Sequence, residues 1–118
     1  MISLAGKAAL ITGGSRGIGA AAVKMFAQAG ADVVFNYHES REAAAQVEAE
    51  ARKHGTRVES LKADLSRSLD NKKLVEFTKD RLGRIDILVA NAGIWNEKDT
   101  PIEKISERDW HEMVKVNL

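Results

Sequence analysis

The glycine-rich segment TGGSRGIG at residues 12–19 is the most constraining feature of this 118-residue chain. It follows a short apolar run and precedes a helical pattern. Such a turn aims backbone N–H groups at one point, and the helix dipole adds roughly half a positive charge there. Gly13 would let the chain leave the strand sharply, Gly17 would let the backbone approach a phosphate, and Gly19 would let the helix pack close to the sheet. The segment predicts a phosphate-binding turn, with a merely tight turn as the alternative.

One pattern repeats along the chain: a short apolar run, a longer amphipathic stretch and then a glycine. The apolar runs, rich in valine, isoleucine and leucine, cover residues 7–12, 32–37, 56–62 and 85–90. The helical patterns cover about 17–29, 40–54 and 68–82. A glycine suited to a left-handed C-cap follows each of them: Gly30, Gly55 and Gly83. Because crossover connections are right-handed, this β-α-β-α-β-α-β order predicts a parallel sheet covered on both faces.

The stretch from residue 100 onward carries two patterns that are typical of helix starts. Residues 100–103 (TPIE) read as an N-cap, a first-turn proline and a reciprocating acid, and residues 106–109 (SERD) offer a similar start. We therefore expect one further helix. No linker or low-complexity stretch interrupts the chain, so residues 1–118 are interpreted as one domain.

Composition narrows the class of protein. Lys and Arg total 18 against 17 acids, a balance that lacks the basic footprint of a nucleic-acid-binding protein. The chain has no cysteine, which fits a reducing compartment, and its histidines lack ligand spacing, so we expect no metal site. We find no signal-peptide pattern and no apolar stretch long enough to span a membrane. These features favour a cytoplasmic protein.

Four motifs in order carry a resemblance to a known family. The turn Thr12-Gly13-x-x-x-Gly17-x-Gly19 resembles the cofactor turn of the short-chain dehydrogenase/reductases. The segments ADL at 63–65, ANAG at 90–93 and VNL at 116–118 resemble later motifs of the same family. The resemblance implies a Rossmann-type α/β fold, with the parallel strand order 3-2-1-4 of its N-terminal half and one further helix.

The same resemblance assigns roles to residues after the third and fourth strands. Asp64 matches the acid that contacts the adenine amino group. Asn91 would tie neighbouring strands together and Gly93 would border the nicotinamide pocket, with strand-end packing as the alternative. Asn117 matches the asparagine of the catalytic tetrad, with a terminal capping role as its alternative.

The end of the second strand bears on which nicotinamide cofactor is used. NAD-specific relatives place an acid there, whereas this chain has Tyr37. Arg16 resembles the basic residue that NADP-preferring members place against the 2′-phosphate. The interpretation is NADP, with a solvated Arg16 as the alternative; Asp32 and Glu39, taken to lie near that strand end, leave NAD open.

The expected cofactor-binding residues combine the turn, the second strand end and the later motifs. Asn36 and Ser40 could add donors near the 2′-phosphate, although Ser40 could instead only cap the next helix. The full set is Thr12, Gly13, Ser15, Arg16, Gly17, Ile18, Gly19, Asn36, Tyr37, Ser40, Asp64, Leu65, Asn91, Ala92 and Gly93.

The residues that would transfer a proton are missing from these 118 residues. In the family, a serine and a tyrosine–lysine pair four residues apart do this work, because a free phenol with a pKa near 10 is a poor base. The single tyrosine, Tyr37, is followed four positions on by Arg41 and belongs to the second strand. The family's serine, tyrosine and lysine lie downstream of the position that matches Asn117. We expect the 118-residue chain alone to be inactive.

The leading hypothesis is the N-terminal part of an NADP-dependent oxidoreductase that acts on a carbonyl or alcohol. Within the family, the sequence most resembles 3-oxoacyl-carrier-protein reductases, which makes 3-oxoacyl thioesters candidate substrates. The family resemblance also implies a homo-oligomer. The alternative is a non-catalytic nucleotide-binding or interaction module. The apolar run 85–90 argues against a stand-alone module, because an exposed final strand would be expected to be polar.

Overall fold

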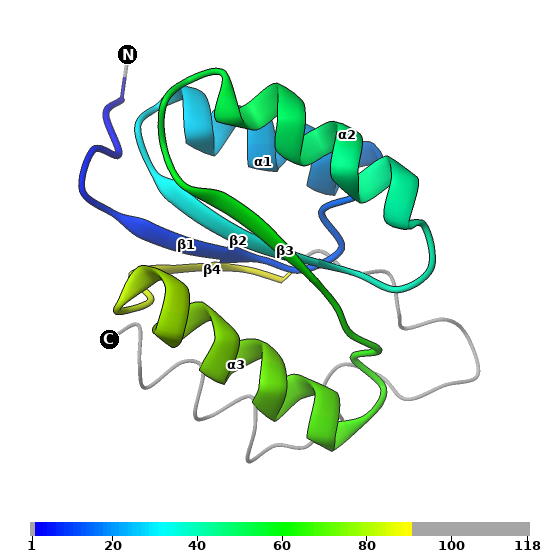
Figure 1. Cartoon of the computed structure of the whole chain (residues 1–118). Coiled ribbons are helices and arrows are strands. Elements are labelled where there is room, and N and C mark those ends of the chain that lie inside the picture. Colours follow the sequence, from blue (N-terminus) through cyan, green and yellow to red (C-terminus); the bar gives the residue numbers. More distant parts are fainter. Residues whose placement is uncertain (1, 91–118) are drawn as a thin grey trace.

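The computed structural model describes residues 2–90, and its strands form one parallel sheet (Figure 1). The elements are β1 (Ala8–Ile11), α1 (Gly17–Gln28), β2 (Asp32–Tyr37), α2 (Arg41–Arg52), β3 (Val58–Lys62), α3 (Ser68–Leu82) and β4 (Ile87–Val89). All strand pairs are parallel and their order is β3-β2-β1-β4, which confirms the predicted topology. The further helix predicted after residue 100 lies outside the described residues.

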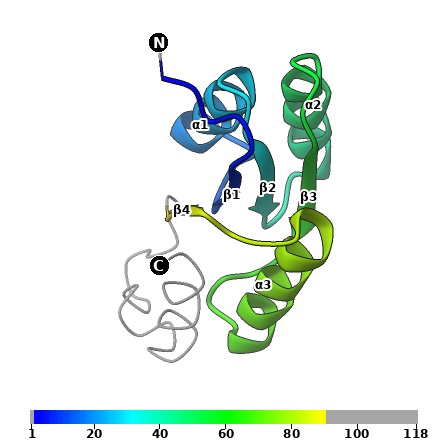
Figure 2. The same cartoon turned by 90° about the vertical axis from the view of Figure 1, so that its left-hand side faces the viewer.

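The helices cover both faces of the sheet, as Figure 2 shows: α1 and α2 lie on one side and α3 on the other. Side chains of a strand alternate between the faces. Val33 and Phe35 therefore join the core under α1 and α2, whereas Leu10 and Val34 join the core under α3. All four are fully buried, which explains why β1 and β2 are almost wholly apolar.

Two helix ends follow the signals that the sequence predicted. The Ser40 hydroxyl accepts the backbone N–H of Ala43 at 3.2 Å and so caps α2. Gly83 follows α3 with φ +84°, a left-handed conformation that favours glycine.

No helix among the described residues is long and apolar enough to cross a membrane.

A carboxylate joins the beginnings of β1 and β4. Asp86 Oδ2 accepts the backbone N–H of Ala8 at 2.9 Å and lies 2.8 Å from Arg84 Nε. Arg84 also donates to the carbonyl of Gly6 at 2.7 Å. The hydrogen bond from Ala8 and the nearby Arg84 lower the pKa of Asp86, against the opposing effect of burial. Asp86 falls within the run 85–90 that was predicted to be a strand. In the structure β4 begins only after it, at Ile87.

One strand-end prediction is corrected by the register. Asp32 was expected near the cofactor end of β2, but it pairs with Ala8 at the first residue of β1. Its Oδ1 accepts the N–H of Arg57 at 2.9 Å. Because all strands run the same way, this places Asp32 at the opposite end of the sheet from the glycine turn. Asp32 therefore gives no support for NAD.

The Asp86 contact predicts a pH-dependent stability. Its folded-state pKa is lowered, so its stabilisation is present above the unfolded pKa of about 3.9 and is lost as pH falls through the folded value. We expect Asp86→Asn to lower the free energy of unfolding at pH 7 by about 1 kcal/mol, since the ion pair with Arg84 is lost. The difference from wild type should shrink below about pH 4.

Denaturant unfolding at several pH values measures this effect. Asp80→Asn is the control, because the Asp80 side chain is 80% exposed and its distance to Arg81 is 4.0 Å. An Asp86→Asn deficit that stays constant down to pH 3 would contradict the electrostatic origin.

Candidate functional site

The carboxyl ends of the parallel strands bring the predicted residues to one edge of the sheet (Figure 1). The glycine-rich turn follows β1, Asn36 and Tyr37 end β2, and the segment 63–65 follows β3. Ligands of open parallel sheets bind at this edge, where the strand order reverses between β1 and its two neighbours. The fold therefore assembles one candidate site from segments that are distant in the sequence.

The turn has the backbone shape that its glycines predict. Gly13 has φ +69° and Gly17 has φ +55°, both in the region that favours glycine. A Cβ added to Gly17 would meet no atom within 4 Å, so the space in front of this backbone is open in the described structure. Gly19 is buried in the first turn of α1.

Gly14 is a constraint that the sequence reasoning did not single out. A Cβ added there would lie 2.6 Å from Phe35 Cβ and 2.7 Å from Phe35 Cγ, closer than real Cβ atoms come. The backbone of the turn therefore rests directly on the side chain of β2. The adjacent glycine pair in the sequence was the only signal for this contact.

The first turn of α1 is free of competing acids. Arg16 occupies the N-cap position with no side-chain capping hydrogen bond, and the first turn contains no acidic residue. Arg16 is exposed, and Ile18 beside it is 79% exposed. Ser15 is half-buried in the same turn. The positive end of the helix dipole and the long side chain of Arg16 thus lie together at the edge of the sheet.

Three predicted residues are engaged in contacts within the protein. Thr12 is buried, and its N–H and hydroxyl both donate to the carbonyl of Val89, at 2.9 and 3.4 Å. The Ser40 hydroxyl caps α2, which is the alternative that the sequence left open. Tyr37 is half-buried and packs against the core under α1 and α2.

The side-chain amide of Asn36 also forms hydrogen bonds within the protein, through both its oxygen and its nitrogen. Oδ1 accepts the N–H of Gly13 at 2.8 Å and Nδ2 donates to the carbonyl of Ala63 at 3.0 Å. The residue is 3% exposed. Nδ2 carries a second N–H, but the side chain is buried, so the structure favours a link between two segments over donation to a 2′-phosphate.

Asp64 keeps one carboxylate oxygen available. Oδ1 accepts both the N–H and the hydroxyl of Ser66, at 3.0 and 2.7 Å, whereas Oδ2 lies 3.6 Å from His38 Nε2. The Ser66 hydroxyl, with its N–H and the charges of His38 and Arg67, lowers the pKa of Asp64. The carboxylate is thus an acceptor at neutral pH. His38 was not predicted to join this site; its place just after β2 was the available signal.

The remaining predicted residues divide into two groups. The Leu65 side chain is buried in the core under α3 and is not available to a ligand. Asn91, Ala92, Gly93 and Asn117 lie outside the described residues. Within residues 2–90, no group of three or more histidines and acids gathers that could hold a metal ion.

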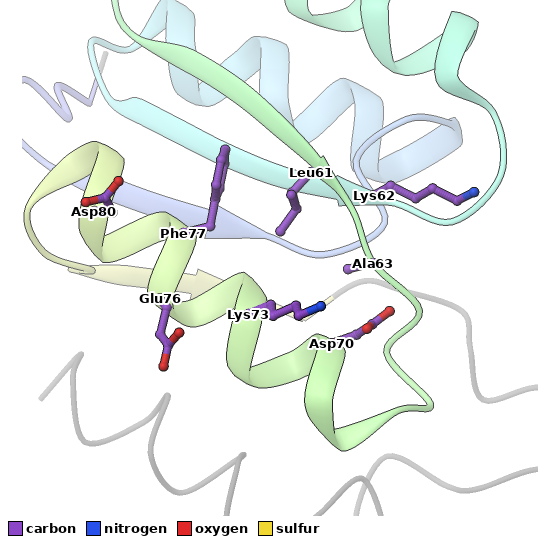
Figure 3. Close-up of a pocket in the computed structure, with 8 residues that line it drawn as sticks. All are labelled: Leu61, Lys62, Ala63, Asp70, Lys73, Glu76, Phe77 and Asp80. Carbon is purple, nitrogen blue, oxygen red and sulfur yellow. The ribbon is translucent and has the colours of Figure 1, made fainter.

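A separate hollow lies between the end of β3 and α3 (Figure 3). Leu61 and Phe77 contribute its apolar part, and Lys62, Lys73, Asp70, Glu76 and Asp80 contribute charges of both signs. Asp70 already accepts the backbone N–H of Asp64 at 2.8 Å. None of the lining residues belongs to the glycine turn, so we do not assign the cofactor to this hollow.

Comparison with known proteins identifies the family. The model of the short chain dehydrogenase family matches residues 7–118. A 3-oxoacyl-[acyl-carrier-protein] reductase of Synechocystis is 37% identical over 118 residues, which are 100% of this chain and 47% of that protein. The chain belongs to the short-chain dehydrogenase family, as its motifs implied.

Solved structures agree with this assignment. A short chain dehydrogenase of Burkholderia cenocepacia in complex with NADP aligns with TM-score 0.81 and 35% identity, covering 97% of this chain and 50% of that one. A short-chain dehydrogenase/reductase of Serratia marcescens aligns with TM-score 0.76 and 38% identity, covering 98% and 46%. The chain thus spans about half the length of the relatives it matches, and its fold is a Rossmann-type nucleotide-binding fold.

The contact between Gly14 and Phe35 predicts a sensitive position. Gly14→Ala adds a methyl group where the Phe35 side chain already lies, and overpacking of this kind lowers the free energy of unfolding by about 1–3 kcal/mol. Denaturant unfolding measures the change. A value within about 0.5 kcal/mol of wild type would show that the turn moves away from β2 without penalty.

Proposed function

We propose that this chain forms the NADP-binding part of an oxidoreductase that transfers hydride between nicotinamide and a carbonyl or alcohol substrate. The observation that carries the proposal is the turn itself. Gly17 adopts φ +55° in open space, and the uncapped N-terminus of α1 with its exposed Arg16 faces the same edge. This combination suits a pyrophosphate, which needs backbone N–H donors, positive potential and no intervening side chain.

The preference for NADP over NAD is supported by charge at the strand end. Tyr37 ends β2, so no carboxylate stands at this position to repel a 2′-phosphate. Asp32, one of the two acids that could favour NAD, lies at the other end of β2. Glu39 is exposed just beyond the strand. The NADP complex of the Burkholderia relative is consistent with this preference.

We expect the protein to bind NADP more tightly than NAD, and Arg16→Ala to remove most of that difference. A charge-assisted contact with phosphate contributes about 1.5–3 kcal/mol, which corresponds to a roughly 10- to 150-fold preference. Calorimetric titration of wild type and variant with both cofactors measures it.

Arg57→Ala is the matched control. Arg57 is also exposed, but it precedes β3 at the opposite end of the sheet, so its loss should leave the cofactor ratio unchanged. Tighter binding of NAD than NADP by wild type would refute the cofactor assignment. An unchanged ratio of NADP to NAD affinity in Arg16→Ala would instead show that Arg16 does not cause the preference.

Catalysis and substrate are further parts of the proposal. By family resemblance Asn117 is the one tetrad residue among these 118, so we expect this stretch alone to bind the cofactor without turnover. The Synechocystis relative is a 3-oxoacyl-[acyl-carrier-protein] reductase, which makes a 3-oxoacyl thioester a reasonable first substrate. A spectrophotometric assay of NADPH oxidation with a 3-oxoacyl thioester tests the expected lack of turnover. Steady turnover that co-purifies with the 118-residue chain would contradict it and would support this substrate class.

We also propose self-association or a further strand at the β4 edge. Ile87, Leu88 and Val89 are half-buried, and among the described strands β4 pairs with β1 alone. An apolar edge of this kind is usually covered. The edge argues against the alternative of a free-standing, non-catalytic nucleotide-binding or interaction module, and a second copy of the chain is one way to cover it.

A further inference from the structure

The side chain of Asn36 connects two parts of the candidate site. It accepts the N–H of Gly13 at 2.8 Å and donates to the carbonyl of Ala63 at 3.0 Å. Gly13 begins the glycine-rich turn, and Ala63 immediately precedes Asp64. A single amide on β2 therefore spans from the segment after β1 to the segment after β3.

The end of β2 holds the turn from both faces of the sheet. Consecutive residues of a strand point to opposite faces, so Phe35 and Asn36 approach the turn from different sides. Phe35 lies beneath Gly14, and the backbone carbonyl of Asn36 accepts the Gly14 N–H at 3.1 Å. Steric contact and hydrogen bonding together leave the first part of the turn little freedom.

We propose that Asn36 is a positioning residue: it fixes the glycine-rich turn relative to Asp64 and does not itself contact the cofactor. The inference rests on the proposed NADP binding. With the Gly13 N–H committed to Asn36, the donors left for a phosphate come from the later residues of the turn and the start of α1. Asn36 thereby sets the direction from which those N–H groups approach.

The chemistry of the position explains why an amide is needed. The side chain must accept from an N–H and donate to a carbonyl at once, and it is 3% exposed. A carboxylate would place an oxygen against the Ala63 carbonyl, and an apolar side chain would leave the Gly13 N–H and the Ala63 carbonyl without this partner. A satisfied buried polar group of this kind specifies one arrangement of the segments around it.

Asn71 provides a matched control. It is also a buried asparagine, 2% exposed, and its Nδ2 donates to the carbonyl of Leu65 at 3.2 Å. It lies on α3, and its side chain hydrogen-bonds to the β3–α3 segment rather than to the glycine turn, so Asn71→Ala removes a bond to that same segment. Comparing the two variants separates loss of stability from loss of positioning.

The test measures NADP affinity and thermal stability of wild type, Asn36→Ala and Asn71→Ala. We expect a lower Tm for both variants, a roughly tenfold or greater loss of NADP affinity in Asn36→Ala, and less than about twofold in Asn71→Ala. Equal losses of affinity would overturn the proposal. If Asn36→Ala does not fold, Asn36→Ser, which keeps a hydroxyl at this position, takes its place. The same loss of NADP affinity relative to Asn71→Ala is then expected.

Amide hydrogen exchange of Gly13, followed by NMR without cofactor, tests the mechanism separately. We expect exchange of this amide to accelerate in the Asn36 variant and to match wild type in Asn71→Ala. Unchanged Gly13 exchange in the Asn36 variant would overturn the proposal. If wild type failed to bind NADP, the function proposed above would fall, whereas the Gly13 result would still decide whether Asn36 holds the turn.

Discussion

The parallel register between β1 and β2 is the constraint on which the candidate site depends. Ile11 pairs with Phe35, so the last residues of β2 lie beside the turn that follows β1. A slip of one residue would exchange the faces of Phe35 and Asn36. Gly14 would then lose the side chain on which it rests, and Gly13 would lose its acceptor. The slip is unfavourable because it would also separate the buried Asn36 amide from the Gly13 N–H and the Ala63 carbonyl.

The same register divides the charged groups between the two ends of the sheet. At the amino end, Asp86 and Arg84 bind the backbone where β1 and β4 begin, and Asp32 binds the N–H of Arg57. These groups stabilise the strand starts. At the carboxyl end, Arg16 and the α1 N-terminus provide positive potential, and Asp64 is the acceptor. The separation leaves the glycine-turn side of the site without a carboxylate from β2.

Much of this arrangement was predictable, for identifiable reasons. The strands and helices followed from apolar periodicity, and the positive φ angles of Gly13 and Gly17 followed from their place between a strand and a helix. The role of Asn36 was not predictable in the same way. Its sequence position fits either a cofactor donor or a buried amide, and the difference lies in which backbone groups of β1 and β3 arrive beside it. His38 beside Asp64 depends on the same convergence.

The sequence by itself determined the family, the order of the elements and the place of the glycine-rich turn, because these rest on local spacing and on backbone conformations that glycine alone adopts readily. The tertiary structure decided which polar side chains remain free for a ligand. Thr12, Asn36 and Ser40 carry groups that could bind a cofactor, yet each makes a hydrogen bond within the protein. Such bonds form between segments brought together by strand pairing, or across a helix start, so only the folded arrangement shows whether a donor is still available.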